Sequence, residues 1–320
     1  MTTSASVPNS WLSVVMPSYQ GEEWIAHALN SLAAQGADGI EVLVIDGGPT
    51  PAAREIARGF SDRLSLRIVA REDLHSWQAK ADFGVTLAEA PHVCLLCVDD
   101  VWLPGRAAAV RSWLEAAPRA GLHIAPSAII DRYGHGLGIW RCPLPSSCPL
   151  SFDTVAERLL VQNFIASPAP VFRKDAWVAS GGLDQTLWYT ADWDMWLKLA
   201  AAGAVYYHPE ITSGFRIHRK SLTMALSRDR VELERQMLRV LESHLPRLRP
   251  ESQDVARAAR VSIAVNLALS AASEGDARGL PAALAEVLKL RPAAMRRFFR
   301  DTRLLERVAA RLRARIKGSF

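Results

Sequence analysis

The stretch Val93-Cys94-Leu95-Leu96-Cys97-Val98-Asp99-Asp100-Val101-Trp102 decides the fold of this chain, because six apolar residues run directly into two adjacent carboxylates. Such a run is typical of a strand that is buried on both faces of a parallel sheet. Open α/β sheets bind ligands at the carboxyl ends of their strands, where Asp99 and Asp100 would lie. A divalent cation on oxygen ligands would relieve the repulsion between the two carboxylates. The alternative is a solvated turn in which one Asp caps a helix that starts at Arg106.

Strand and helix patterns alternate on both sides of this stretch. Apolar runs predict strands over residues 12–17, 41–46, 66–69, 93–98, 124–130, 170–173 and 205–207, and an extended piece over 212–218. Helical spacing predicts helices over residues 24–34, 51–59, 77–89, 104–117, 174–179 and 190–202, and residues 138–150 are expected to form a loop. This alternation predicts an α/β fold with a mostly parallel sheet, right-handed crossovers and flanking helices.

The texture of the sequence changes after about residue 226. Helix-period segments rich in Ala, Leu and Arg cover residues 231–245, 254–270, 280–290 and 294–317. We therefore expect an α/β domain over residues 1–225 and an all-helical C-terminal region over 226–320. The net charge of +5 is concentrated in this basic region, but no nucleic-acid motif accompanies it, so nucleic acid is not an expected partner. A solvated, packed appendage and a surface for peripheral membrane or partner contact are the two interpretations.

Composition indicates an ordinary globular protein, with 49% apolar and 22% charged residues among 320. No apolar stretch reaches the length of a membrane span, and the polar residues up to Ser10 do not resemble a signal peptide. We therefore expect a cytoplasmic location, with the alternative of peripheral contact at the inner face of the membrane. Cys94 and Cys97 form a C-x-x-C pair inside the apolar run, and we interpret them as small core residues on opposite faces of the strand.

Carboxylates close two of the predicted strands. Asp46 ends the strand over 41–46, while Asp99 and Asp100 end the strand that follows residue 92, and Asp192 and Asp194 open the helix over 190–202. The chain has no G-x-G-x-x-G and no P-loop, which excludes a standard dinucleotide or ATP site. Acidic side chains instead suit ribose hydroxyls, base amides and a metal that carries a diphosphate.

Six segments in order, within residues 12–223, carry a resemblance to a known family. They are Val14–Gln20, Glu41–Gly48, Asp99–Gly105, Phe172–Lys174 with Gly181–Asp184, Ala191–Leu199 and Phe215–Ser221. Together they resemble the inverting glycosyltransferases of family 2, which use nucleotide sugars and have the GT-A fold. The third segment is similar to the family's D-x-D-type metal motif, and the fifth to its E-D-x-D-L-W-L-R-L motif.

The resemblance implies a donor site at the strand ends. Pro17, Tyr19 and Asp46 would line the nucleotide base and ribose. Asp99 would face the ribose or the sugar, and Asp100 would bind Mg²⁺ or Mn²⁺ bridging the diphosphate. The donor would be a nucleotide-diphosphate sugar, of the UDP or dTDP type.

The resemblance also implies the chemistry of transfer. Asp192 would be the general base that deprotonates an acceptor hydroxyl, although the dipole of its helix is expected to lower its pKa. His218 would approach the metal or the diphosphate, with Arg216 near it. Trp188 and Tyr189 would stack on an acceptor sugar or belong to the core. The acceptor would be a glycan or glycoconjugate in surface-polysaccharide or lipid-linked glycan assembly.

Three departures from the family pattern leave the donor open. Ala191 stands where Glu is common, so that either Asp194 compensates or Asp192 acts alone; Asp82 stands where Asn is expected, and Pro49 replaces Ser or Thr. The alternative function is a non-catalytic module that binds a nucleotide sugar or a partner on the same fold. A sugar nucleotidyltransferase is disfavoured, because no Gly-rich basic loop follows the first strand.

Overall fold

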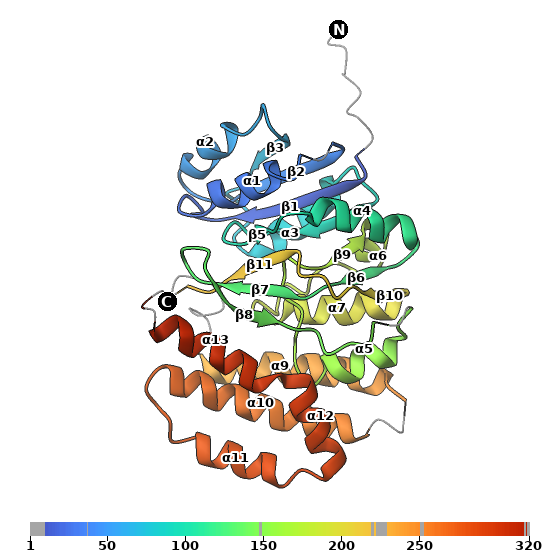
Figure 1. Cartoon of the computed structure of the whole chain (residues 1–320), viewed down its shortest axis with the longest axis vertical. Coiled ribbons are helices and arrows are strands. Elements are labelled where there is room, and N and C mark those ends of the chain that lie inside the picture. The colour runs from blue at the N-terminus through green and yellow to red at the C-terminus, as the bar shows by residue number, and fades with distance from the viewer. Residues whose placement is uncertain are drawn as a thin grey trace.

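The computed structural model describes residues 10–36, 38–146, 149–218, 221, 229–249, 253–316 and 318. Its main sheet consists of β1 (Leu12–Ser18), β2 (Ile40–Asp46), β3 (Ser65–Ala70), β4 (His92–Leu95), β6 (Leu122–Ile124), β9 (Val171–Arg173) and β10 (Val205–Tyr207). The strands lie in the order β10-β6-β9-β4-β1-β2-β3. Only β9 runs antiparallel to its neighbours in this sheet. The predicted mostly parallel sheet is therefore confirmed, and Figure 1 shows it in the upper part of the molecule.

Helices cover both faces of this sheet. They are α1 (Ile25–Ala33), α2 (Ala52–Arg58), α3 (Trp77–Leu87), α4 (Arg106–Ala116), α5 (Phe152–Leu159), α6 (Lys174–Ala179) and α7 (Ala191–Ala202). Successive residues of a strand point to opposite faces. In β1, Val14 and Met16 accordingly join the apolar cluster of α1, α2 and α4, whereas Val15 joins that of α3, α6 and α7. Both faces are buried, which confirms the α/β class.

A second sheet was not predicted. It contains β5 (Val101–Trp102), β7 (Ser127–Ile130), β8 (Gly136–Trp140) and β11 (Ser213–Arg216), in the order β5-β11-β7-β8. The single strand expected over residues 124–130 is wrong, because Pro126 separates β6 from β7 and the two belong to different sheets; proline has no N–H for a ladder. The loop expected over residues 138–150 is wrong at its start, where β8 continues to Trp140.

Strand β4 is shorter than the apolar run that predicted it. It ends at Leu95, and the backbone N–H of Leu96 makes a last bond of 2.9 Å to the carbonyl of Val15. Cys94 is buried in the strand, but Cys97 lies half-exposed in the following loop, so the two cysteines do not occupy opposite faces of one strand. Neither aspartate of this loop caps α4, which begins after Gly105 without a side-chain cap.

The C-terminal region is helical, as predicted. It contains α9 (Arg230–His244), η1 (Leu245–Arg247), α10 (Gln253–Ser273), α11 (Leu280–Leu288), α12 (Pro292–Thr302) and α13 (Leu304–Ile316). The single helix expected over residues 294–317 is wrong, since Arg303 adopts a positive φ of 45° and separates α12 from α13. The proposed boundary between residues 225 and 226 lies outside the described residues, as do Lys317 and part of the sixth segment, Arg219 and Lys220.

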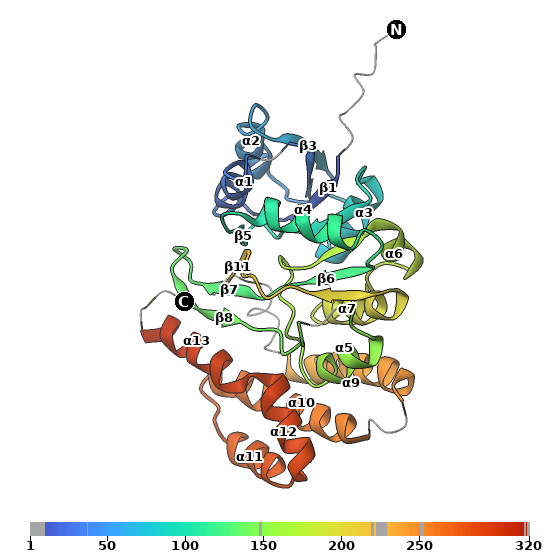
Figure 2. The ribbon, with the colours of Figure 1, turned by 45° about the vertical axis from the view of Figure 1, so that its right-hand side comes forward.

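These helices pack on the α7 side of the main sheet. Residues of α9, α10 and α12 belong to the same apolar cluster as those of α5 and α7, and Figures 1 and 2 show the helices stacked below the sheet. Helix α13 lies along β8, where Ala310 and Ala314 contact Leu137 and the Arg313 guanidinium donates to the Leu137 carbonyl. Among the described residues, Val255–Ser273 of α10 is long and apolar enough to cross a membrane, but half of it is buried as in a core helix.

Candidate active site

The carboxyl ends of β1 and β2 meet at one rim of the main sheet. Ser18 pairs with Asp46 in the parallel register, and its hydroxyl donates to the Asp46 carboxylate at 2.9 Å. Asp46 is fully buried and also lies 3.3 Å from Nε of Arg54. Pro17 is buried within β1, whereas Tyr19 is 57% exposed beyond its end. Of the three residues predicted to line a nucleoside, Tyr19 is therefore the one whose side chain stands open.

A lysine that was not singled out from the sequence lies beside this rim. The Lys80 side chain is buried beneath the backbone of Gly47, where an added Cβ would come within 2.3 Å of Lys80 Cε. Its Nζ donates to the carbonyls of His75 and Ser76 and lies 5.5 Å from the Tyr19 ring centroid. Burial lowers the pKa of Lys80, although the charge of Asp46 opposes that shift. The sequence signal that could have identified Lys80 is its place on the apolar face of the helix expected over residues 77–89.

Asp99 and Asp100 lie together in the loop between β4 and β5. One ligand atom from each of Cys97, Asp99 and Asp100 can be chosen so that all lie within 4.8 Å of one another. Asp100 is 2% exposed, and burial followed by the charge of Asp99 raises its pKa well above its usual value. Two carboxyl groups held this close, one of them out of water, fit a divalent cation that would neutralise both.

Strand β11 and the residues after it hold this loop. Oδ1 of Asp100 accepts the backbone N–H of Arg216 at 2.8 Å, and Nε of Arg216 donates to the Asp99 carbonyl at 2.7 Å. Nη1 of Arg216 donates to the carbonyls of Asp131 and Arg132. These bonds engage the guanidinium with backbone, so it positions the two carboxylates. Nε2 of His218 lies 3.0 Å from Oδ2 of Asp99, which brings the predicted histidine to the carboxylate pair.

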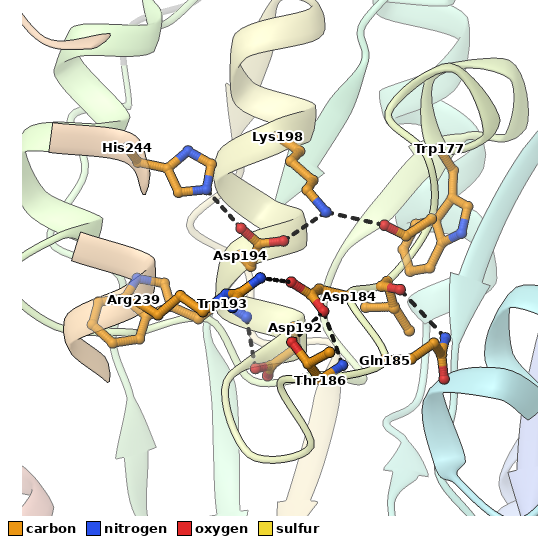
Figure 3. A network of polar contacts seen from close by, with 12 residues as sticks. Trp177, Asp184, Gln185, Thr186, Asp192, Trp193, Asp194, Lys198, Arg239 and His244 are labelled. Carbon is orange, nitrogen blue, oxygen red and sulfur yellow. Dashed lines mark hydrogen bonds and ion pairs between the residues drawn. The ribbon is translucent and has the colours of Figure 1, made fainter. Parts of the chain in front are cut away.

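Asp192 lies at the start of α7, half-buried and without a cationic partner among the described residues. Its oxygens accept the backbone N–H of Trp193 at 2.7 Å, the Ser167 hydroxyl at 3.3 Å and the Asn163 amide at 3.4 Å (Figure 3 draws the first). Burial nevertheless raises the pKa of Asp192 to about 6. The net shift of this pKa is opposite to the one that the helix dipole favours, because loss of solvation outweighs the hydrogen bonds that stabilise the charged carboxylate.

Cys97 connects the two carboxylate groups in space. Burial raises the pKa of its thiol well above the usual value, and the charges of Asp99, Asp100 and Asp192 raise it further. The thiol is thus within electrostatic reach of both the loop after β4 and the first turn of α7. The sequence placed Cys97 in the core, and only its position two residues before Asp99 could have linked it to the site.

Asp194 does not stand in for the missing glutamate at position 191. Figure 3 shows its carboxylate between Nε2 of His244 and Nζ of Lys198, each 2.7 Å away. Burial opposes ionisation of Asp194, yet the hydrogen bonds from His244 and Lys198 together lower its pKa. Ala191 itself is fully buried in the apolar cluster. The hypothesis that Asp194 compensates is wrong, since its side chain is committed to α9 and its own helix.

Asp82 likewise has a structural partner set. Its oxygens accept Nε1 of Trp177 at 2.9 Å, the backbone N–H of Leu183 at 3.1 Å and Nε2 of Gln185 at 2.9 Å. Gly182, at a φ of 71°, approaches so closely that an added Cβ would lie 2.8 Å from Oδ1 of Asp82. Asp82, which stands where the family has Asn, therefore serves to hold the loop over residues 181–185 against α3.

A cavity of about 340 Å³ opens beside Asp192, between the α/β part and the C-terminal helices. From the α/β part it is lined by side chains that include Asn163, Ser167, Tyr189, Asp192 and Phe215, and from α9, α10 and α13 by Leu233, Met237, Asn266, Leu269, Arg307, Arg311 and Arg315. Tyr189 therefore lines the same cavity as Asp192, and its role as an acceptor contact stays a prediction. The arginines of α13 were missed, because nothing in their sequence distinguishes them from a solvated basic face.

Comparisons with known proteins relate the chain to one family and one fold. Residues 13–146 match the model of glycosyl transferase family 2. An uncharacterized glycosyltransferase of Rickettsia prowazekii is 23% identical over 219 residues, which cover 66% of this chain and 65% of that protein. The chain therefore aligns with somewhat under two thirds of the length of that relative.

Two solved structures share the fold. The structure of S. aureus TarS 1-349 in complex with UDP-GlcNAc superposes with a TM-score of 0.57 at 15% identity, covering 97% of this chain and 92% of that one. The mannosyltransferase PcManGT from Pyrobaculum calidifontis, in complex with GDP-Man and Mn²⁺, gives a TM-score of 0.56 at 15% identity, covering 94% and 86%. At these identities the likeness establishes the fold, which is the predicted GT-A type.

Proposed function

The chain belongs to glycosyl transferase family 2, as its six sequence segments predict, and we propose that it transfers one sugar from a nucleotide-diphosphate sugar to a hydroxyl, with inversion. The observation that carries the proposal is the cluster of Asp99, Asp100 and Cys97, from each of which one ligand atom can be chosen so that all lie within 4.8 Å of one another. Asp192, a carboxylate of raised pKa, lines a cavity on the same part of the chain, and its charge acts on the Cys97 thiol. That combination suits a reaction that expels a diphosphate while an acceptor loses a proton.

The donor belongs at the rim formed by β1, β2 and β4. Tyr19 and Asp46 are proposed to contact the nucleoside, together with the backbone near Pro17, and Asp99 to contact the ribose or sugar. The complexes of the two fold relatives with UDP-GlcNAc and with GDP-Man support a nucleotide sugar as donor. Within that class we favour a UDP or dTDP sugar.

Asp100, with Asp99 and His218 beside it, would hold Mg²⁺ or Mn²⁺. Carboxylate oxygens and a neutral imidazole are ligands that these ions accept, and the fold relative bound to Mn²⁺ supports such a site. When bound, the ion would act as a Lewis acid that neutralises the charge developing on the departing diphosphate. Arg216 would keep the carboxylate pair in place, since its backbone N–H donates to the Asp100 carboxylate and its Nε to the Asp99 carbonyl.

Asp192 is proposed as the general base. The acceptor oxygen attacks the anomeric carbon on the face opposite the diphosphate, the bond from that carbon to the diphosphate oxygen breaks, and the hydroxyl proton passes to Asp192. A pKa of about 6 leaves most of the carboxylate ionised at neutral pH while making it more basic than an exposed aspartate. One attack on one face gives inversion of the anomeric configuration.

We propose that the chain has two parts, an α/β domain over residues 1–225 and a helical region over residues 226–320. The acceptor, a glycan or glycoconjugate of surface-polysaccharide or lipid-linked glycan assembly, would enter the cavity where the two parts meet. A cytoplasmic location with peripheral membrane contact is proposed; exposed Leu305, Leu312 and Ile316 beside the arginines of α13 support that contact.

Thermal unfolding of the purified protein with UDP, dTDP or GDP, each with and without Mn²⁺, tests the proposal. A nucleotide that binds the folded state adds about 2.7 kcal/mol at one hundred times its Kd. We expect a rise in Tm that requires Mn²⁺ and that is lost in Asp100→Asn but retained in Asp62→Asn, a matched change at an exposed carboxylate. No rise with any nucleotide, or a rise that persists in Asp100→Asn, would contradict the proposal and favour the non-catalytic module.

A further inference from the structure

Helix α13 aims a row of arginines into the cavity beside Asp192. Arg307, Arg311 and Arg315 follow one another at intervals of four residues, which places them on one face of the helix, and all line the cavity. Among the described residues that line it, Asp192 is the one acidic side chain. The cavity therefore holds an excess of positive charge at the place where an acceptor would meet the proposed base.

Arg307 is built into the wall of this cavity. Its Nη1 donates to Oε1 of Gln162 at 2.6 Å, and its Nη2 donates to Oδ1 of Asn266 at 2.9 Å. Both acceptors are neutral amides, and Nε of Arg307 is buried without a partner in the described part of the chain. Burial, followed by the charge of Arg311, lowers the pKa of Arg307 to about 9. The guanidinium is thus fixed in position but its charge is not neutralised.

Arg311 and Arg315 add to this unbalanced charge. Arg311 is half-buried and has no hydrogen-bond or ion-pair partner among the residues that the structure describes. Nη2 of Arg315 donates to the carbonyl of Ser273. Neighbouring arginines outside the cavity are paired instead, as Arg297 is with Glu157 and Arg300 with Asp301. Guanidinium groups held close together and partly out of water are costly unless an anion joins them.

We propose that this cavity is the acceptor site and selects an acceptor that carries a phosphate-type anion close to the attacking hydroxyl. The inference rests on the proposed function, because it takes Asp192 as the base. Planar guanidinium forks match the oxygens of phosphate. The apolar side chains of Leu233, Met237 and Leu269 on the other walls suit the carbon skeleton of the acceptor.

We assign the anion to the second substrate and not to the diphosphate of the donor. Asp46, Asp99 and Asp100 mark the donor rim, and none of them is among the described residues that line the cavity. A donor diphosphate held at that rim would leave the three arginines of α13 without a counter-charge. An anionic group on the second substrate supplies it.

Calorimetric titration of the whole protein with inorganic phosphate, in buffer stripped of divalent metal, tests this site apart from the donor rim. We expect phosphate to bind the wild type and to bind Arg311→Gln at least about tenfold more weakly, since one charge-assisted contact is lost. Arg296→Gln removes the same charge from an exposed position on α12 and should bind phosphate as the wild type does. No phosphate binding, or equal binding by Arg311→Gln, would overturn the inference.

Hydrolysis of the donor by water, measured with Mn²⁺ and no acceptor, separates this inference from the proposed function. A protein that hydrolyses donor but does not bind phosphate through Arg311 loses the acceptor inference alone. A protein that binds phosphate through Arg311 but never cleaves a donor loses the proposed function, and with it the assignment of the anion to an acceptor.

Displacement of the bound phosphate distinguishes an acceptor glycan that contains phosphate from an acceptor that carries a lipid phosphate. Displacement by a soluble phosphodiester, glycerophosphoglycerol, supports an acceptor from a phosphate-containing glycan. Displacement only by vesicles of phosphatidylglycerol, and not of phosphatidylcholine, supports a lipid-borne phosphate. Failure of both to compete would overturn the proposal, because a phosphate-bearing acceptor must occupy the same guanidinium groups.

Discussion

The first turn of α7 carries a carboxylate on each of two faces, and the pKa values of the two carboxylates shift in opposite directions. Asp192 faces the cavity and accepts hydrogen bonds only from neutral groups among the described residues. Burial raises its pKa to about 6. Asp194, two residues further on, faces α9 and is held by His244 and Lys198. Burial opposes the charge of Asp194 as well, but the hydrogen bonds from His244 and Lys198 lower its pKa overall.

One helix thus carries a carboxylate that stabilises the fold on one face and a carboxylate suited to chemistry on the other. A buried carboxylate that is bonded to a histidine of α9 and a lysine of its own helix contributes to holding α7 against α9. A buried carboxylate without them costs stability and keeps its basicity, which is a mark of functional groups. Sequence alone gives these two aspartates the same helix and the same turn, so the contrast arises from what packs on each face.

The largest expected effect is on catalysis at the cavity face. Asp192→Asn removes the proposed base while keeping the side chain's shape, so transfer should fall by roughly 10²–10⁴-fold. Mn²⁺-dependent nucleotide binding should be unchanged, because the donor rim is untouched. Transfer assays and thermal shifts on the same preparation measure the two quantities. Near-normal transfer by this variant would remove Asp192 as the base.

The face toward α9 should show a stability effect instead. Asp194→Ala leaves His244 and Lys198 without their shared carboxylate, and breaking a buried pair of this kind costs about 3 kcal/mol. Urea unfolding measures the loss, and a double-mutant cycle with His244→Ala isolates the coupling between the two side chains. A loss below about 1 kcal/mol, or a fall in transfer per folded molecule, would contradict the separation of the two faces.

A smaller effect of opposite sign is expected for stability at Asp192. Its pKa is raised from 3.8 to about 6, so the folded state binds the proton more tightly than the unfolded state. Stability is therefore lost as pH rises between these values, and the whole cost is present above them. Asp192→Asn should be more stable than the wild type at pH 7.5, by about 1–3 kcal/mol after allowance for partial exposure.

The same comparison at acid pH serves as its internal control. Below pH 3.8, Asp192 is protonated in both the folded and the unfolded state. The stability advantage of Asp192→Asn should therefore vanish there. Urea unfolding at the two pH values measures it. A variant that is less stable than the wild type at pH 7.5 would mean that the carboxylate stabilises the fold.

Local patterns in the sequence predicted the elements that are built from local contacts. The apolar runs that end at Asp46 and before Asp99 predicted two strands of one parallel sheet. They are β2 and β4, with β1 between them, and the rim that carries these carboxylates follows from the geometry of such a sheet. The match to the family's segments then supplied roles for residues such as Asp192 and His218. These predictions needed only residues close in sequence and one rule of topology.

Contacts between distant segments were not predictable in the same way. The pairing of Asp194 with His244 joins residues fifty positions apart, and the second sheet brings β11 beside β5 and β7. Arg307 and Arg311 are indistinguishable in sequence from the exposed arginines of the same helix. Their place in the cavity depends on how α13 packs along β8, which no periodicity encodes.

The pH dependence of kcat/KM for transfer shows whether Asp192 is the general base. With Asp192 as a base of pKa about 6, the rate should be level above about pH 7 and fall tenfold for each unit below pH 6. That acid limb should be absent from the residual activity of Asp192→Asn. A flat profile between pH 5 and 8, or an acid limb that persists in Asp192→Asn, would contradict the account.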